Sequence, residues 1–244
     1  MLGALVVILL SWLLLKKLAN EPITVLGIVP SKHRLKEFLI GMLFMAVIAI
    51  INFSGQAYFK GVTYALNPDY GIGRMLGGSF WVVQAVIFEE LVFRGALLYL
   101  LIRYIGIIKA CLISSILFGI YHWFSYGVFG SRLILMIYIF LITGAGGWMF
   151  AFAFAKTKSL FAPTGLHLGW NLVTAIIFSA GPIGNQILIE QGEPIQTNDW
   201  DTLIFFTLQA IVAPGLVTWY LQKKYQPDSR AADTEDDRVH EEVL

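Results

Sequence analysis

The chain has 244 residues, of which 57% are hydrophobic and 14% are charged. Globular domains average about 45–50% apolar and about 25% charged residues, so this composition excludes an ordinary soluble domain and predicts a membrane protein with several spanning helices. The formal net charge is +1 and the basic residues form no stripe, which argues against a nucleic-acid partner. The single cysteine excludes a disulfide framework and a cysteine-based metal cluster.

Seven apolar blocks follow one another along the chain, separated by polar or charged residues. Five of them reach the length of about 20 residues that a spanning helix needs, and a sixth does so if it begins near Leu35 or continues through Ala57. The first block is followed, not preceded, by Lys16 and Lys17, so we interpret it as a short uncleaved anchor rather than a signal peptide. The blocks are 2–15, 38–53, 79–102, 110–129, 133–155, 160–180 and 203–221.

The distribution of lysine and arginine predicts the orientation. With the N-terminus outside and seven spans, 13 of the 17 basic residues fall inside and three outside, as the positive-inside rule requires. The sequence therefore predicts an all-α, polytopic membrane helix bundle of about seven transmembrane helices (six to eight), N-out/C-in. We expect residues 1–222 to form one membrane-embedded domain and residues 223–244 a charged, disordered cytoplasmic tail. The compact size favours a prokaryotic plasma membrane.

Three charged residues lie inside an apolar block, at Glu89, Glu90 and Arg94. Each costs about 2.5–3.5 kcal/mol at the centre of a spanning helix unless it is paired. Glu90 and Arg94 are four residues apart with the acid first, which is the favourable order for an ion pair on one helix face. Glu89 points well away from that pair, and we expect it to face the interior of the bundle.

Two other blocks also carry polar residues that can reach the bundle interior. His167 and Asn171 are four residues apart and share one helix face. His122 lies in the block 110–129. Gly165 and Gly169 flank His167 in a small-xxx-small pattern that allows a second helix backbone to approach closely. We expect three helices to bring these polar side chains and the unpaired glutamate into one buried pocket.

This set of residues is compatible with three chemistries. Glu89 and a histidine could activate water while His167 and Asn171 stabilise an oxyanion, as in a hydrolase. The same groups could form a proton or ion pathway in a transporter, or Glu89, His122 and His167 could bind zinc as a His₂Glu site. A His-Glu-x-x-His sequence is absent, and so are duplicated halves, which weighs against the metal and transporter readings.

Three short motifs carry a resemblance to a known family. They are Glu-Glu-x-x-x-Arg at 89–94, Phe-x-x-x-His at 118–122 and His-x-x-x-Asn at 167–171. In this order on separate helices they resemble the motifs of the CAAX protease and bacteriocin-processing family, which includes the type II CAAX prenyl proteases. The resemblance covers the motif-bearing core 79–180.

The resemblance implies a role for each matching residue. Glu89 would be the general base that activates water, and His122 would hold and polarise that water. His167 and Asn171 would stabilise the oxyanion of the tetrahedral intermediate. The supporting residues would be Glu90, Arg94 and Phe118. No cofactor is implied by this reading, and zinc remains the alternative.

The resemblance also implies a class of partner. The substrate would be a membrane-associated protein or peptide reached within the lipid bilayer. If that substrate is prenylated, CAAX-type processing removes the last three residues after the modified cysteine. A bacteriocin-immunity protein on the same scaffold is a non-catalytic alternative.

Overall fold

The computed structural model describes residues 2–196 and 198–225, which are mostly helical. The chain begins with α1 (Leu2–Leu18), a 3₁₀ turn (Ile23–Leu26) and the long helix α2 (Lys32–Lys60). Next come α3 (Ile72–Arg94), α4 (Ala96–Ile105), α5 (Ile107–Ser125) and α6 (Leu133–Thr157). Helix α7 (Phe161–Leu172) runs into a π-helical turn (Val173–Ile177), and α8 (Asp199–Thr207) runs through a second one (Leu208–Val212) into α9 (Ala213–Lys224). The predicted start of the disordered tail at 223 is wrong, because α9 continues through Lys224, and the rest of the tail lies outside the described residues from position 226 onward.

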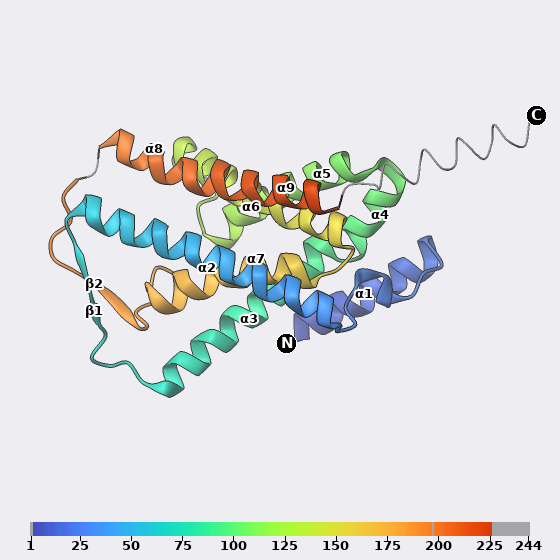
Figure 1. The fold of residues 1–244 in the computed structure, drawn as a ribbon, viewed down its shortest axis with the longest axis horizontal. Helices are drawn as coiled ribbons and strands as arrows, with labels where there is room; N and C mark the ends of the chain where they lie inside the picture. The colour runs from blue at the N-terminus through green and yellow to red at the C-terminus, as the bar shows by residue number, and fades with distance from the viewer. Residues whose placement is uncertain (1, 197, 226–244) are drawn as a thin grey trace, which may run out of the picture.

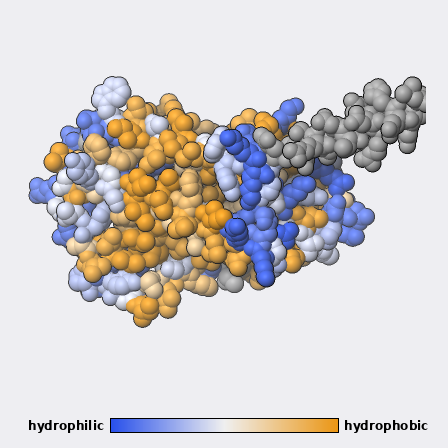
Figure 2. All heavy atoms as spheres, viewed as in Figure 1, coloured by the Kyte–Doolittle hydropathy of each residue, from blue (hydrophilic) through white to orange (hydrophobic). Residues whose placement is uncertain are grey.

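Four helical runs are long and apolar enough to cross a membrane, within the part of the chain that the structure describes. They are α2, α5, α6 and the continuous stretch Trp200–Lys224. The block predicted at 38–53 therefore lies within a helix of 29 residues, about 43 Å long at 1.5 Å per residue. Figure 2 shows a broad hydrophobic surface between two more hydrophilic ends. The total of seven spans and the N-out/C-in orientation stay predictions.

The block predicted at 79–102 is not one continuous helix. Helix α3 ends at Arg94, and Gly95 separates it from α4. A Cβ at Gly95 would collide with the backbone carbonyl of Leu91, so glycine permits this tight change of direction. The break places Glu89, Glu90 and Arg94 in the last two turns of α3.

A small antiparallel sheet joins two connections that are far apart in the sequence. Strand β1 (Thr63–Leu66) pairs with β2 (Leu188–Gln191), with Thr63 opposite Gln191. The expectation of an all-α chain is wrong at this place. In Figure 1 the two strands lie at one end of the bundle, beyond the end of α2. The sheet therefore ties the α2–α3 connection to the α7–α8 connection.

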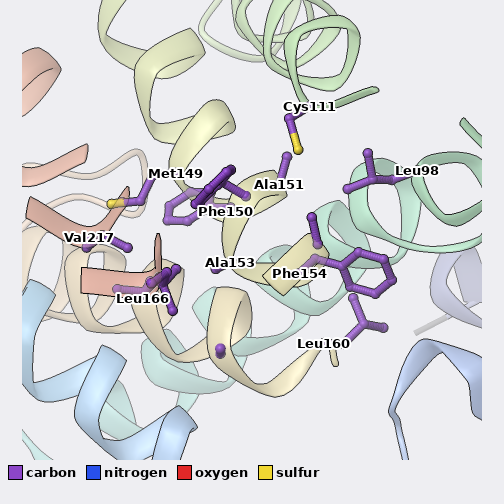
Figure 3. Packing of buried hydrophobic residues seen from close by; sticks show 14 of the residues in the cluster. Leu98, Cys111, Met149, Phe150, Ala151, Ala153, Phe154, Leu160, Leu166 and Val217 are labelled. Atoms are coloured by element: carbon purple, nitrogen blue, oxygen red, sulfur yellow. The ribbon is translucent and has the colours of Figure 1, made fainter. Parts of the chain in front are cut away.

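The main core gathers around the second half of α6. Figure 3 shows side chains from this half, including Met149, Phe150 and Phe154, among residues of the surrounding helices. Leu98 from α4, Cys111 from α5, Leu166 from α7 and Val217 from α9 belong to the same buried cluster. Helix α6 is thus the central element against which the site-bearing helices pack.

Candidate active site

The predicted ion pair lies at the end of α3. Glu90 Oε1 is 3.2 Å from Arg94 Nη1, and the two side chains are 2% and 0% exposed. The second terminal nitrogen of Arg94 donates a hydrogen bond of 3.2 Å to the carbonyl oxygen of Gly147 on α6. The pair is therefore confirmed in geometry, and it also fastens α3 to α6.

The guanidinium of Arg94 is enclosed by aromatic rings from two other helices. Its central carbon is 4.2 Å from the ring centroid of Phe118 on α5 and 5.1 Å from that of Phe150 on α6. Such cation–π contacts stabilise a cation that water does not reach. Phe118, predicted as a supporting residue, therefore contacts the ion pair directly.

His167 is held from two sides on α7. Its Nδ1 is 2.8 Å from Glu90 Oε1, and its ring stacks on Phe150 with centroids 4.6 Å apart and planes inclined by 17°. The bond to Glu90 was not predicted, because it depends on how α3 and α7 meet in space. Since a carboxylate accepts, Nδ1 is the protonated nitrogen. Glu90 therefore fixes the position of His167 as well as pairing with Arg94.

The glycines beside His167 bring α7 close to α2. A Cβ at Gly165 would collide with the backbone carbonyl of Phe38, and one at Gly169 with that of Met42. The small-xxx-small prediction is confirmed, with α2 as the approaching helix. This close contact fixes the depth at which His167 and Asn171 lie.

Glu89 has its contacts on other helices, as its helical position predicted. Its Oε2 is 3.7 Å from His167 Nε2, which is ion-pair range rather than a hydrogen bond. The hydroxyl of Tyr121 on α5 donates to Oε1 over 3.5 Å. The side chain is 13% exposed, compared with 2% for Glu90. Of the two adjacent carboxylates, Glu89 is therefore the more accessible one.

His122 is fixed by its own helix. Its Nδ1 is 2.8 Å from the carbonyl oxygen of Phe118, so this nitrogen carries the proton and Nε2 keeps a lone pair in the neutral ring. The ring also meets Phe118 edge-on, with centroids 4.5 Å apart. The Phe-x-x-x-His spacing thus orients the imidazole.

A cavity of about 90 Å³ lies between α5, α6, α7 and the second π-helical turn. His122, His167 and Asn171 all line it, together with Thr143 and Gln209. Glu89 is not among the described residues that line it, and reaches the site beside His167. The expected common pocket is therefore present for three of the four predicted residues.

The three ligands of the alternative zinc site do not form a metal-binding group. Among the described residues, no group of three His, Cys, Asp or Glu side chains could hold a metal ion. Glu89 and His167 are close together, whereas His122 is directed by its bond to Phe118.

Two residues that touch the site were missing from the sequence prediction. Tyr121 directly precedes His122 within the Phe-x-x-x-His motif, and this adjacency was an available signal. Phe150 lies in an apolar helix with many aromatic residues, so nothing in the sequence distinguishes it. Both determine how Glu89 and His167 are placed.

The fold and the site define a helical protein with membrane-spanning segments and a buried cluster of carboxylates and imidazoles. Residues 72–173 match the family model described as "Type II CAAX prenyl endopeptidase Rce1-like". The matched segment runs from the start of α3 to the end of α7 and contains all three motifs. It confirms the predicted resemblance over this segment and supports a CAAX-type intramembrane endopeptidase as the general activity. No curated protein and no solved structure matches the chain.

Proposed function

We propose that the chain is a glutamate-dependent intramembrane endopeptidase. The observation that carries this proposal is the placement of Glu89 beside His167, which in turn lines one cavity with His122 and Asn171. A carboxylate, two imidazoles and an amide supply a base and hydrogen-bond donors, which are the groups that amide hydrolysis requires.

Glu89 accepts a proton from water, and the water oxygen attacks the carbonyl carbon of the scissile bond. His122 orients this water through Nε2, since its Nδ1 is occupied by the Phe118 carbonyl. The proton is then passed to the amide nitrogen as the carbon–nitrogen bond breaks. Base catalysis of this kind contributes about 10²–10⁴ to a rate.

The oxyanion is stabilised from α7. Asn171 donates through its amide nitrogen and His167 through Nε2 when the ring carries both protons. Glu90, fixed by Arg94, holds His167 in position through Nδ1. Charge stabilisation by positioned donors acts strongly in a site from which water is largely excluded.

The substrate is a membrane-associated protein or peptide, and CAAX-type C-terminal processing is the form that the family match favours. No observation in the described residues supports zinc hydrolysis, transport or an immunity role. In this proposal the reaction needs no metal cofactor. The protein is integral to a prokaryotic plasma membrane, and its polar tail lies in the cytoplasm.

Replacing Glu89 with Gln tests this function. The terminal peptides of the membrane proteins would be compared between cells that carry the wild-type chain and cells that carry Glu89→Gln. This comparison finds membrane proteins that accumulate uncleaved in the variant. Purified chains in liposomes would then be given these proteins, with Glu21→Gln as the carboxylate control. We expect cleavage to fall about 10²–10⁴-fold in Glu89→Gln alone, with unchanged insertion. Equal cleavage by both variants would refute the proposal.

A further inference from the structure

A second and larger cavity lies beside the candidate active site. It is an apolar groove of about 360 Å³ between α2 and α9, with α6 and α7 as its floor. Its lining includes Ile40, Phe44, Ala153, Leu166, Leu216 and Trp219. Ile40, Leu216 and Trp219 are 45%, 46% and 55% exposed, so the groove opens sideways on the apolar surface of the bundle.

One end of the groove is closed by a polar cluster at the start of α2. Glu37 has a side chain only 6% exposed, and its Oε1 is 3.1 Å from Lys224 Nζ and 3.2 Å from His33 Nε2. The hydroxyl of Tyr225 donates to the same carboxylate. The groove is therefore apolar along its length and polar at this end.

Basic side chains surround the polar end. Lys36 is exposed and directly precedes Glu37, which lines the polar end of the groove. Lys223 is exposed, and its ammonium lies 4.5 Å from the ring centroid of Trp219. Figure 2 shows a hydrophilic band where α2 begins and α9 ends, next to the hydrophobic surface.

Within the part of the chain that the structure describes, the positive charge at this end is in excess. Among the described residues, Glu21 and Glu37 are the acids here, and both are paired, with Arg103 at 3.5 Å and with Lys224. Basic pockets between membrane helices attract anionic headgroups, and each lysine near the surface contributes about 1 kcal/mol. A tryptophan beside such a pocket is typical of the level of the headgroups.

We propose that this groove binds one anionic phospholipid of the surrounding bilayer. One acyl chain lies between α2 and α9, and the headgroup is held by Lys36 and Lys223. The apolar length of the groove suits a hydrocarbon chain, and the lysines beside its polar end suit an anionic headgroup. A helix of a second copy or of a partner would present no such anionic group, and the crosslinking experiment distinguishes it.

Photocrosslinking identifies the occupant. The full chain, with a diazirine amino acid at Leu216, would be placed in nanodiscs of equal parts phosphatidylglycerol and phosphatidylcholine with identical acyl chains. The control carries the same group at Leu112 on α5, which is 51% exposed and outside the groove. At position 216 we expect adducts with phosphatidylglycerol to dominate, with one lipid bound per chain. At position 112 we expect adducts with phosphatidylglycerol and phosphatidylcholine in equal amounts. Equal lipid adducts at 216, a peptide adduct or a crosslinked dimer would overturn the proposal.

Charge variants test the headgroup contact independently. In Lys36→Gln/Lys223→Gln, we expect the preference for phosphatidylglycerol over phosphatidylcholine to fall about thirtyfold, which corresponds to about 1 kcal/mol per lysine. The matched control is Lys17→Gln/Lys109→Gln, which removes two exposed lysines that do not adjoin a residue lining the groove. An unchanged preference in the first variant, or an equal loss in both, would contradict the assignment.

Discussion

His167 Nδ1 lies 2.8 Å from Glu90 Oε1, the same oxygen that is 3.2 Å from Arg94. One carboxylate oxygen therefore serves both the ion pair within α3 and the imidazole of α7. The second oxygen of Glu90 is buried without a hydrogen-bond partner, as is Nε of Arg94, among the described side chains. The Glu90–Arg94 pair thus positions His167, although the buried polar atoms of the pair are not all hydrogen-bonded.

The ion pair should be sensitive to the loss of one partner. Glu90→Gln leaves the Arg94 guanidinium buried without its counter-charge, and we expect a loss of about 3–5 kcal/mol in the free energy of unfolding. Thermal unfolding in detergent measures this loss. Cleavage should also fall, because the uncharged amide oxygen of glutamine is a weaker acceptor for His167 Nδ1 than the carboxylate.

The double variant Glu90→Met/Arg94→Met is the matched comparison. Replacing a whole buried pair by apolar residues is often neutral or stabilising, so we expect it to unfold later than Glu90→Gln while remaining inactive. A double variant that unfolds earlier than the single one would show that the pair itself stabilises the fold.

The α7 donors should act on the transition state rather than on substrate binding. Asn171→Ala is expected to lower kcat by about 10²–10³-fold with little change in KM, since a donor to the oxyanion acts only once that charge develops. Gln222→Ala, an exposed amide on α9, serves as the control. Steady-state kinetics on a cleaved substrate would distinguish this from a binding role, in which KM rises and kcat does not change.

The close contact between α2 and α7 should tolerate no side chain. Gly165→Ala and Gly169→Ala place a Cβ against the carbonyls of Phe38 and Met42, so we expect both variants to lose cleavage and unfold at lower temperature. At Gly215 of α9 the same Cβ would meet no atom within 4 Å, and Gly215→Ala should be neutral or stabilise by up to about 1 kcal/mol. Three indistinguishable melting curves would argue against the close approach.

Metal removal should leave the activity intact. Because Glu89, His122 and His167 do not form a three-ligand group, treatment with 1,10-phenanthroline should not change the cleavage rate. The measurement is residual cleavage after dialysis against the chelator. Loss of cleavage that added Zn²⁺ restores would instead support the zinc alternative.

The features that depend on one helix were accessible from the sequence. The i,i+4 spacing predicted the Glu90–Arg94 pair, and the same geometry predicted that Glu89 faces away from it. The glycines beside His167 predicted a close helix contact, although not its partner α2. Local periodicity is sufficient for such features because neighbours on a helix surface are fixed by the helix itself.

The features that depend on how distant segments meet were not accessible. The bond between His167 and Glu90 joins residues 77 positions apart, and β1 pairs with a strand more than 120 residues later. Neither four-residue strand carries a pattern long enough to predict its partner. Gly95 was the local signal for the break in the block 79–102, but an isolated glycine is common in membrane helices.

The single cysteine of the chain, Cys111, lies buried on α5 with no exposed surface. A thiol reagent that does not cross membranes would therefore meet no accessible native thiol on the protein. One cysteine introduced at a helix end becomes the sole reactive position, without any native residue having to be removed first. Adding such a residue to each connection in turn, and labelling sealed vesicles from either side, would count the crossings and reveal which face points outward.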